Sequence, residues 1–220
     1  MKSWFQVALL ALGLCSATAL AGPDSFDVGS GRDGPLTVTA AGTVINRHAR
    51  VTGPIAPGDN VLLVAGTEGF GAGDLVMVLQ VTGMVPEPLP GLTGPVELSR
   101  DAVGRWELVR LAAVGEGALT VSSPLVHSYA AQVTQVIRVP EYTHVRIQRD
   151  ASLRAVPWNG GTGGVVAFLA TGSVHNEGEI TATGAGFRGG RYVPDSSNPV
   201  ACSSMDVGAR PGAQKGEGVA

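Results

Sequence analysis

The sequence predicts an all-β fold: a compact β domain, then short parallel β-solenoid-like coils, and then an irregular Gly/Pro-rich tail. Three observations support this fold class. The 220 residues include 32 glycines and 14 prolines, which interrupt helices and suit turn-rich architectures. From Pro35 onward, short β-branched runs alternate with turn signals. After the first 21 residues, apolar residues nowhere recur at helical spacing over a useful length.

The N-terminal residues 1–21 have the pattern of a secretory signal peptide. Lys2 supplies a short positive region, residues 7–14 are apolar, and Ala19-Leu20-Ala21 is a small-x-small cleavage site. The apolar run is far shorter than the roughly 20 residues that span a bilayer. We expect cleavage after Ala21, export to the extracellular space or outer cell surface, and no membrane span in the mature chain. An uncleaved anchor is the alternative.

We interpret residues 22–34 as a polar linker and residues 35–140 as a β-rich domain. Continuous apolar runs at 61–64 and 75–79 predict strands that are buried on both faces. The clearest hairpin joins residues 106–114 to 118–126 through a turn with two glycines. The other expected elements are strands at 36–40, 43–46 and 135–139 and a long loop at 83–104.

Residues 141–190 are predicted to form the solenoid-like coils. When the chain is shifted by 21 positions, residues 145–153 (VRIQRDASL) lie over 166–174 (VAFLATGSV) with matching apolar spacing. A strand, a corner and another inward residue, repeated every 20-odd residues, are typical of a solenoid coil. Two copies are fewer than such arrays need, so a plain antiparallel sheet stays open as the alternative. Residues 191–220 are interpreted as the irregular tail.

Cys202 is the single cysteine that remains after the predicted signal peptide. An exported protein rarely keeps one free thiol in an oxidising compartment. If Cys202 is bridged, its partner is a cysteine of another chain or one beyond residue 220. Because the final GAQKGEGVA has no capping element, we expect an N-terminal piece of a longer protein. The sequence leaves open the oligomeric state and whether Cys202 is bridged.

Gly184, Gly186 and Gly189 spell G-x-G-x-x-G, the pattern of a dinucleotide-phosphate cradle. Such a cradle needs a helix that begins after the glycines, but two prolines follow in GRYVPDSSNPV. The same spelling recurs at residues 29–34 before any predicted strand. We therefore expect these glycines to form turns, and a helix beginning near residue 189 would contradict this expectation.

No catalytic, cofactor-binding or metal-binding residue is predicted. The four histidines lack the spacing of a zinc site, and these are His48, His127, His144 and His175. The acidic residues of the lead-in match neither the EF-hand nor the β-roll calcium pattern, and these are Asp24, Asp27 and Asp33. A calcium site in the lead-in stays open beside a solvated linker.

Two features keep a carbohydrate-active or carbohydrate-binding protein open as the alternative. Glu177 and Glu179 would share one strand face, and paired carboxylates, together with Arg188 in a groove, can hydrolyse glycosidic bonds. Trp158 and Phe187 lie beside glycine-rich turns and could stack on sugars if exposed. Core packing is the commoner use of such aromatics, the others being Trp106, Tyr129, Tyr142 and Tyr192.

Four stretches in order resemble the N-terminal region of the AgmC-like group of myxobacterial adventurous gliding motility proteins. They are GFGAGDLVMVLQ, RWELVRLAAVGEGALTVSSPLVHSY, VIRVPEYTHVRI and GGVVAFLATGSVHNEGEITATGAGFRGG. The resemblance covers most of residues 35–220 and implies a large, glycine-rich, exported surface protein linked to gliding. It implies no catalytic residue.

Together these observations predict an exported, non-enzymatic surface scaffold or adhesin linked to gliding motility. Its expected partners are cell-surface or extracellular polysaccharides or proteins. A formal net charge of −3, evenly scattered, gives no reason to expect nucleic acid or an anionic membrane as a partner. No cofactor is expected.

Overall fold

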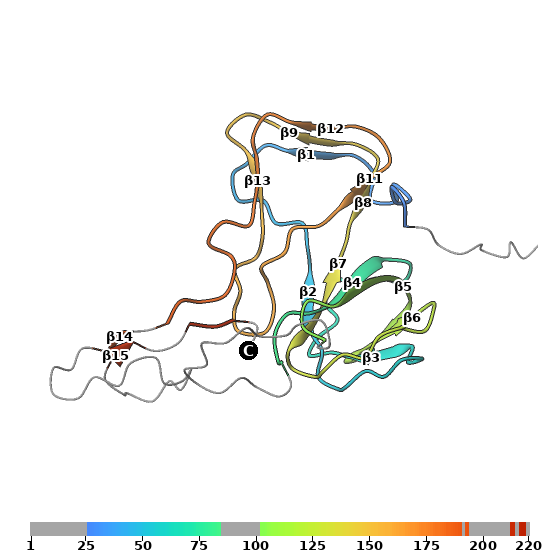
Figure 1. Cartoon of the computed structure of the whole chain (residues 1–220). Helices are drawn as coiled ribbons and strands as arrows, with labels where there is room; N and C mark the ends of the chain where they lie inside the picture. The colour runs from blue at the N-terminus through green and yellow to red at the C-terminus, as the bar shows by residue number, and fades with distance from the viewer. Residues whose placement is uncertain (1–25, 85–101, 191, 194–211, 214–215, 219–220) are drawn as a thin grey trace, which may run out of the picture.

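The computed structural model describes residues 26–84, 102–190, 192–193, 212–213 and 216–218. These ranges contain strands and turns and no helix, which confirms the all-β prediction. The strands form a curled antiparallel sheet and, beside it, a set of parallel strands that we call the parallel stack (Figure 1). Within these ranges, no helix offers the length and apolarity needed to cross a membrane.

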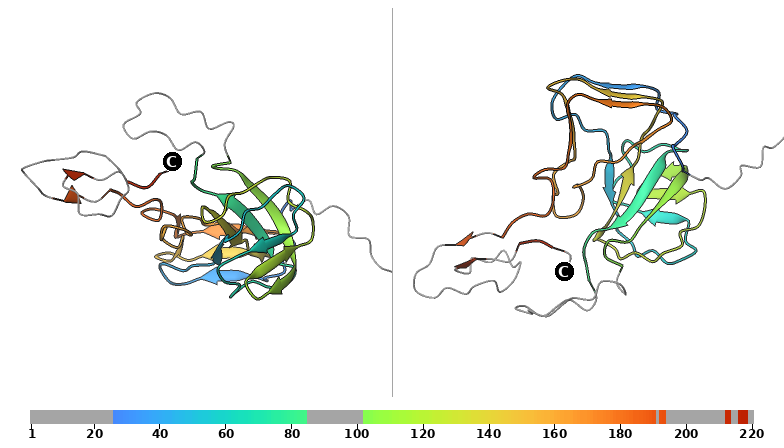
Figure 2. Two further views of the ribbon diagram at one scale, coloured as in Figure 1. Left: turned by 90° about the horizontal axis from the view of Figure 1, so that it is seen from below. Right: turned by 45° about the horizontal axis from the view of Figure 1, so that its top comes forward.

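The curled sheet contains six strands in antiparallel order. From one edge to the other these are β2 (His48–Arg50), β7 (Thr134–Arg138), β4 (Leu75–Gln80), β5 (Trp106–Gly115), β6 (Ala118–Val121) and β3 (Val61–Leu63). A bridge between Val51 and Val64 brings the two edges together, so that β3 curls round towards β2 (Figure 2). The predicted hairpin is present as β5 and β6, with Gly117 at φ 65° in its turn.

One face of the curled sheet carries the larger apolar core. Its buried residues are Ala49, Val51, Ile55, Leu62, Val64, Val76, Val78, Val109, Leu111, Leu119, Val121, Leu125, Tyr129 and Val136. The expectation that residues 61–64 are buried on both faces is wrong, because Val61 and Leu63 are exposed. β3 is an edge strand with the core on one side only, so alternate residues face solvent.

The parallel stack has three rungs. Its strands are β1 (Leu36–Val38), β8 (Glu141–Tyr142), β9 (Val145–Ile147), β10 (Ser152–Arg154), β11 (Leu169–Ala170), β12 (Val174–Asn176) and β13 (Glu179–Thr181). All of their pairings are parallel: β1 with β9, β9 with β12, β10 with β13, and β8 with β11. The antiparallel alternative is therefore wrong for these strands. The solenoid interpretation of residues 141–190 stays a prediction.

The expected repeat of 21 residues is wrong. Val145 lies beside Val174, 29 positions later, and Leu153 lies beside Ile180, 27 positions later. Apolar spacing alone did not reveal that the chain between β10 and β11 leaves the stack and packs against the curled sheet. In this excursion the amide of Ala167 donates a hydrogen bond to Asn46 Oδ1 (3.1 Å).

The curled sheet interrupts the parallel stack in sequence. β1 lies within the predicted 35–140 region, yet it pairs with β9 of the predicted 141–190 region. Thr43 forms a parallel bridge with Leu153, after which the chain builds the curled sheet and returns to the stack at Glu141. The smaller apolar core, inside the stack, comprises Val38, Tyr142, Val145, Ile147, Ala151 and Leu153.

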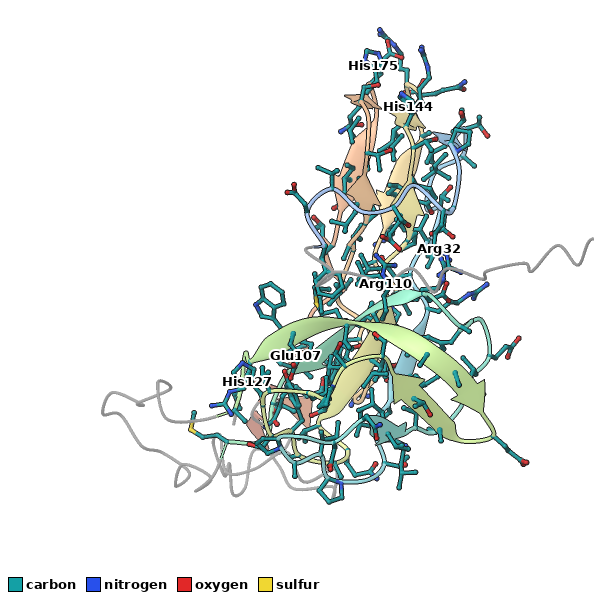
Figure 3. The ribbon with its side chains drawn as sticks, turned by 90° about the vertical axis from the view of Figure 1, so that its right-hand side faces the viewer. Arg32, Glu107, Arg110, His127, His144 and His175 are labelled. Atoms are coloured by element: carbon teal, nitrogen blue, oxygen red, sulfur yellow. The ribbon has the colours of Figure 1, made fainter. Side chains whose placement is uncertain are left out.

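An ion-pair network fills the junction between the two parts, where Figure 3 places Arg32 and Arg110. Arg138 of β7 pairs with Asp33 and, through Nε, with Asp74 Oδ2 (2.9 Å). Asp33 Oδ2 also accepts a hydrogen bond from the amide of Glu141 (2.7 Å). The described end of the predicted 22–34 linker is thus packed onto the stack rather than solvated.

Several expectations concern residues outside the described ranges. These are the signal peptide at 1–21, the disulfide state of Cys202, most of the 83–104 loop and most of the 191–220 tail. Within the tail, β14 (Tyr192–Val193) pairs with β15 (Gly212–Ala213) in antiparallel fashion.

Candidate functional site: a basic groove beside strand β2

An open groove of about 870 Å³ lies between β2 and the segment that leaves the stack after β10. We call it the basic groove. Its lining residues are Val44, Asn46, Arg47, His48, Ala49, Arg50, Ala65, Gly66, Glu68, Val156, Asn159, Gly160, Gly161, Thr162 and Arg188. The lining contains three arginines and one carboxylate, that of Glu68. Because its positive charges outnumber its negative one, the lining is basic.

A tight turn at residues 159–162 forms one wall of the groove. Asn159 Oδ1 accepts hydrogen bonds from the amides of Gly161 (3.0 Å) and Thr162 (2.9 Å), and Asn159 Nδ2 bonds to Thr162 Oγ1 (3.2 Å). Gly163 follows with φ 118°, and a Cβ there would lie 2.6 Å from the carbonyl oxygen of Pro157. The backbone of this wall is therefore fixed before any ligand arrives.

Strand β2 and the residue before it supply two of the arginines. The stem of Arg50 packs over Gly161, where a Cβ would lie 3.0 Å from Arg50 Cδ. The stem of Arg47 packs over Gly69, where a Cβ would lie 2.9 Å from Arg47 Cγ. Within the described part of the chain, neither guanidinium forms an ion pair. Both side chains thus present an unneutralised charge on a supported stem.

The third arginine, Arg188, is already bound to a carboxylate. Glu217 Oε1 accepts hydrogen bonds from Arg188 Nε (2.9 Å) and Nη2, and Glu217 Oε2 accepts one from the Arg188 amide (2.9 Å). Hydrogen bonds from Arg188 hold the pKa of Glu217 below its usual value. A residue close to the C-terminus thus occupies one arginine at the edge of the groove.

His48 lies in the groove wall and is held by a buried amide. Gln135 is fully buried and exchanges two hydrogen bonds with Gly163, donating from Nε2 (3.0 Å) and accepting at Oε1 (2.9 Å). This fixes Gln135 Oε1 as an acceptor, so His48 Nδ1, 3.0 Å away, carries the proton. Burial lowers the pKa of His48, although the Gln135 hydrogen bond opposes this shift.

The four histidines do not gather. His48 lines the groove, whereas His144 and His175 lie at the outer end of the stack and His127 lies near Glu107 on the curled sheet (Figure 3). No group of three or more His, Cys, Asp or Glu residues within the described ranges is arranged to hold a metal ion. Of the lead-in carboxylates, Asp33 pairs with Arg138, Asp27 is exposed, and Asp24 lies outside the described ranges.

The cluster of Glu177, Glu179 and Arg188 that the carbohydrate-active alternative would require does not form. Glu177 lies in the corner after β12 and pairs with Arg146 (3.2 Å), whereas Glu179 begins β13. The two carboxylates do not share a strand face because the corner at Gly178 separates them. Arg188 pairs with Glu217 instead.

Trp158 and Phe187 do not form the exposed stacking platform that the carbohydrate-binding alternative would use. Trp158 is buried and meets the exposed Phe187 edge-on, with ring centroids 5.4 Å apart. Core packing therefore accounts for Trp158, as it does for Tyr129 and Tyr142, which are buried as well. Trp106 is exposed on β5 and does not line the groove.

The glycine motifs form turns. Gly184 has φ 69°, and no helix begins at Gly189 or Gly190, the last residues described before the gap at 191. At 29–34 the three motif glycines all adopt positive φ, and Gly29 packs so closely that a Cβ would lie 2.9 Å from the Cβ of Leu169. The positive φ of Gly184 agrees with the turn predicted for it.

Sequence reasoning missed the groove because its walls are distant along the chain. Arg47 and Arg50 lie about 110 positions before the turn at 159–162 that faces them. The local string NRHAR, residues 46–50, is the single available signal, and it reads equally well as an exposed strand.

No family model and no curated protein matches this chain. Among solved structures, the chain is similar to the tailspike gp54 of Acinetobacter baumannii bacteriophage AP22, solved in complex with A. baumannii capsular saccharide. Identity is 12%, coverage is 62% of this chain and 24% of that chain, and the TM-score is 0.34.

Two further tailspikes show likeness at the same level. For the tailspike gp61 of Pseudomonas phage phi297, identity is 13%, coverage 66% and 23%, and the TM-score 0.32. For the tailspike gp49 of Pseudomonas phage LKA1, the values are 11%, 56% and 27%, and 0.30. The chain spans about a quarter of the length of these proteins. Likenesses this weak assign neither a family nor a ligand, so the functional conclusion rests on the groove.

Proposed function

We propose that this chain is an exported surface protein that binds polysaccharide in the basic groove and does not cleave it. The observation that carries this proposal is the groove itself: open, about 870 Å³, and lined by several polar and charged side chains. Its volume falls within the usual range for small-ligand sites, roughly 300–1,000 Å³. An open trough suits a chain of sugars, which must enter and leave along its length.

The chemistry of the lining matches sugar hydroxyls, which both donate and accept hydrogen bonds. Arg47 and Arg50 donate, Glu68 accepts, Asn159 Nδ2 keeps one N–H to donate, and the Thr162 hydroxyl can donate or accept. Because Asn159 is locked by its own turn, little side-chain freedom is lost when a ligand binds there.

Binding without turnover is favoured by the number of carboxylates. Glycosidases use a pair of carboxyl groups about 5–5.5 Å or 6.5–9.5 Å apart. Glu68 is the one carboxylate among the lining residues. Glu217, at the edge of the groove, already accepts hydrogen bonds from Arg188. The expected export and the likeness to gliding motility proteins support a role at the cell surface, in adhesion or as a scaffold.

The test is a binding panel with the full secreted chain. Affinity electrophoresis through gels that contain single polysaccharides measures binding, and a reducing-end assay measures cleavage. Ala65→Trp fills the groove from an exposed lining position and should weaken binding at least tenfold. The matched control is Ala113→Trp, an exposed alanine of β5 outside the lining, which should leave binding unchanged.

Two outcomes would reject the proposal. If no polysaccharide is retarded, or if both tryptophan variants bind like the parent, the groove is not a glycan site. Release of reducing ends that stops in Glu68→Gln would establish the carbohydrate-active alternative instead.

A further inference from the structure

We infer that the polysaccharide bound in the basic groove is acidic, and that its carboxylate or sulfate groups pair with Arg47 and Arg50. This inference rests on the proposed polysaccharide binding at the same groove. It commits the site to one chemical class of ligand.

The first argument is the charge balance of the lining. Arg47 and Arg50 make no ion pair within the described part of the chain, and Glu68, the one lining carboxylate, pairs with neither of them. The junction network shows a different state: there Arg138 has two carboxylate partners. Two guanidinium groups that have no ionic partner in the described part of the chain therefore line the basic groove.

The second argument is the support given to these arginines. The Arg47 side chain lies over Gly69 and the Arg50 side chain over Gly161, and an added Cβ would lie 2.9 Å from Arg47 Cγ and 3.0 Å from Arg50 Cδ. These contacts restrict both side chains where they line the groove. A guanidinium presents its N–H groups in a planar fork that matches carboxylate and sulfate oxygens better than single hydroxyl groups.

The third argument is that the groove edge already binds a carboxylate. Glu217 takes hydrogen bonds from the Arg188 side chain and from its amide. A Cβ at Gly160, which lines the groove, would lie 2.7 Å from Arg188 Nη2 and 3.7 Å from Glu217 Oε1. Glu217 thus holds a carboxylate where an acidic sugar would place one, and it competes with the ligand for Arg188.

The experiment compares three soluble polymers on the full secreted chain: polygalacturonate for carboxylate, dextran sulfate for sulfate, and dextran as the neutral reference. Arg47→Ser and Arg50→Ser should each weaken binding of the charged polymer about tenfold, the usual effect of losing a charge-assisted hydrogen bond. Arg149→Ser, the control, removes the same charge from an exposed corner residue outside the groove and should change binding less than twofold.

Glu217→Gln provides a test with the opposite sign. Removing its charge weakens its hold on Arg188 and frees a third cation, so affinity for the acidic polymer should rise severalfold. Raising NaCl from 50 to 500 mM should weaken binding in the parent more than in Arg47→Ser, because screening acts on the charge that the variant lacks. Equal urea midpoints of parent and variants show that the fold is retained.

The results separate the two proposals. Preference for polygalacturonate or for dextran sulfate identifies which anion is bound, and either supports the inference. Equal binding of dextran, unchanged by both arginine variants but lost in Ala65→Trp, overturns the acidic ligand and leaves polysaccharide binding intact. Tighter binding of single-stranded DNA than of either charged polymer overturns both. If Arg149→Ser weakens binding of the charged polymer as much as Arg47→Ser does, the effect comes from net charge and the inference is overturned.

Discussion

Arg110 of β5 and Glu141 of β8 form a two-point ion pair that ties the curled sheet to the parallel stack. Arg110 Nη1 lies 2.6 Å from Glu141 Oε2, and Nη2 lies 2.8 Å from Oε1. Glu141 is fully buried and accepts a further hydrogen bond from the amide of Ser30 (2.8 Å). One carboxylate therefore joins the N-terminal segment, the sheet and the stack.

Glu141→Gln should destabilise the protein by about 1–3 kcal/mol, because it removes the charge of a fully buried carboxylate that accepts hydrogen bonds from Arg110 and Ser30. Urea unfolding measures the loss. Glu177→Gln is the matched control: its partner Arg146 is exposed, and such pairs contribute about 0–1 kcal/mol. Equal costs for the two variants would show that burial does not set the strength of the Arg110–Glu141 pair.

The same carboxylate should make stability depend on acid. Burial by itself raises the pKa of Glu141, but the hydrogen bonds from Arg110 and Ser30 outweigh burial and hold that pKa below the ordinary value of 4.5. The unfolded chain therefore takes up this proton first as pH falls. The contribution of Glu141 is present above about pH 4.5 and is lost as pH falls through the folded-state pKa. Unfolding free energies of parent and Glu141→Gln should converge as pH falls below about 4.5, and parallel curves would contradict this.

His48 should make the free energy of unfolding depend on pH in a higher pH range than Glu141 does. Because burial lowers its pKa from 6.5, the folded state keeps this histidine neutral where the unfolded chain protonates it. Its contribution is complete above about pH 6.5 and declines as pH falls from there to the folded-state pKa. His48→Asn keeps a donor near Gln135 and cannot titrate, so its stability should change less between pH 8 and pH 5 than that of the parent.

Truncation of paired side chains in the parallel stack should lower the free energy of unfolding by unequal amounts. Leu153 and Ile180 are register partners, yet Leu153 is 0% exposed and Ile180 is 41% exposed. Leu153→Ala should cost about 2–5 kcal/mol, whereas Ile180→Ala should cost well under about 1 kcal/mol. Thermal unfolding distinguishes the two variants. Similar shifts in melting temperature would mean that Ile180 is covered in solution.

The corner between β12 and β13 tolerates no side chain. A Cβ at Gly178 would lie 2.2 Å from the carbonyl oxygen of Ala151 and 2.6 Å from that of Gln148. Gly178→Ala should therefore separate two rungs at a cost of about 1–3 kcal/mol. Gly186→Ala meets nothing within 4 Å and serves as the control, with a change within about 0.5 kcal/mol. Hydrogen exchange at β9 and β12 should increase in the first variant alone.

Local patterns in the sequence are enough to predict the fold class and the clearest hairpin. The β5–β6 turn depends on two glycines and flanking apolar residues, which are all neighbours in the chain. The rung spacing was not predictable in this way, because Val145 pairs with Val174 only after an excursion of variable length. An offset chosen to match apolar residues has no information about that excursion.

The candidate site was harder still to predict. Trp158 and Glu177 were singled out by residue type, but type does not determine burial or partner: one is packed in the interior and the other pairs with Arg146. Arg47 and Arg50 become informative only once the 159–162 turn is placed opposite them. Glu217 matters through a contact with Arg188 that no spacing rule encodes.

The return of the chain to the stack at Glu141 has a consequence for the order of folding. β9 and β12 are 29 residues apart in register and close a short loop, whereas Leu36 must find Val145 across more than 100 residues. The entropic cost of closing a loop grows only slowly with loop length. However, the chain incurs this cost before the stabilising contacts form. Because His48 and Ile137 are partners on neighbouring strands, a curled sheet that folds first brings the two ends of this span together. We therefore expect the pairing of β1 with β9 to form after the curled sheet, which brings the two strands together.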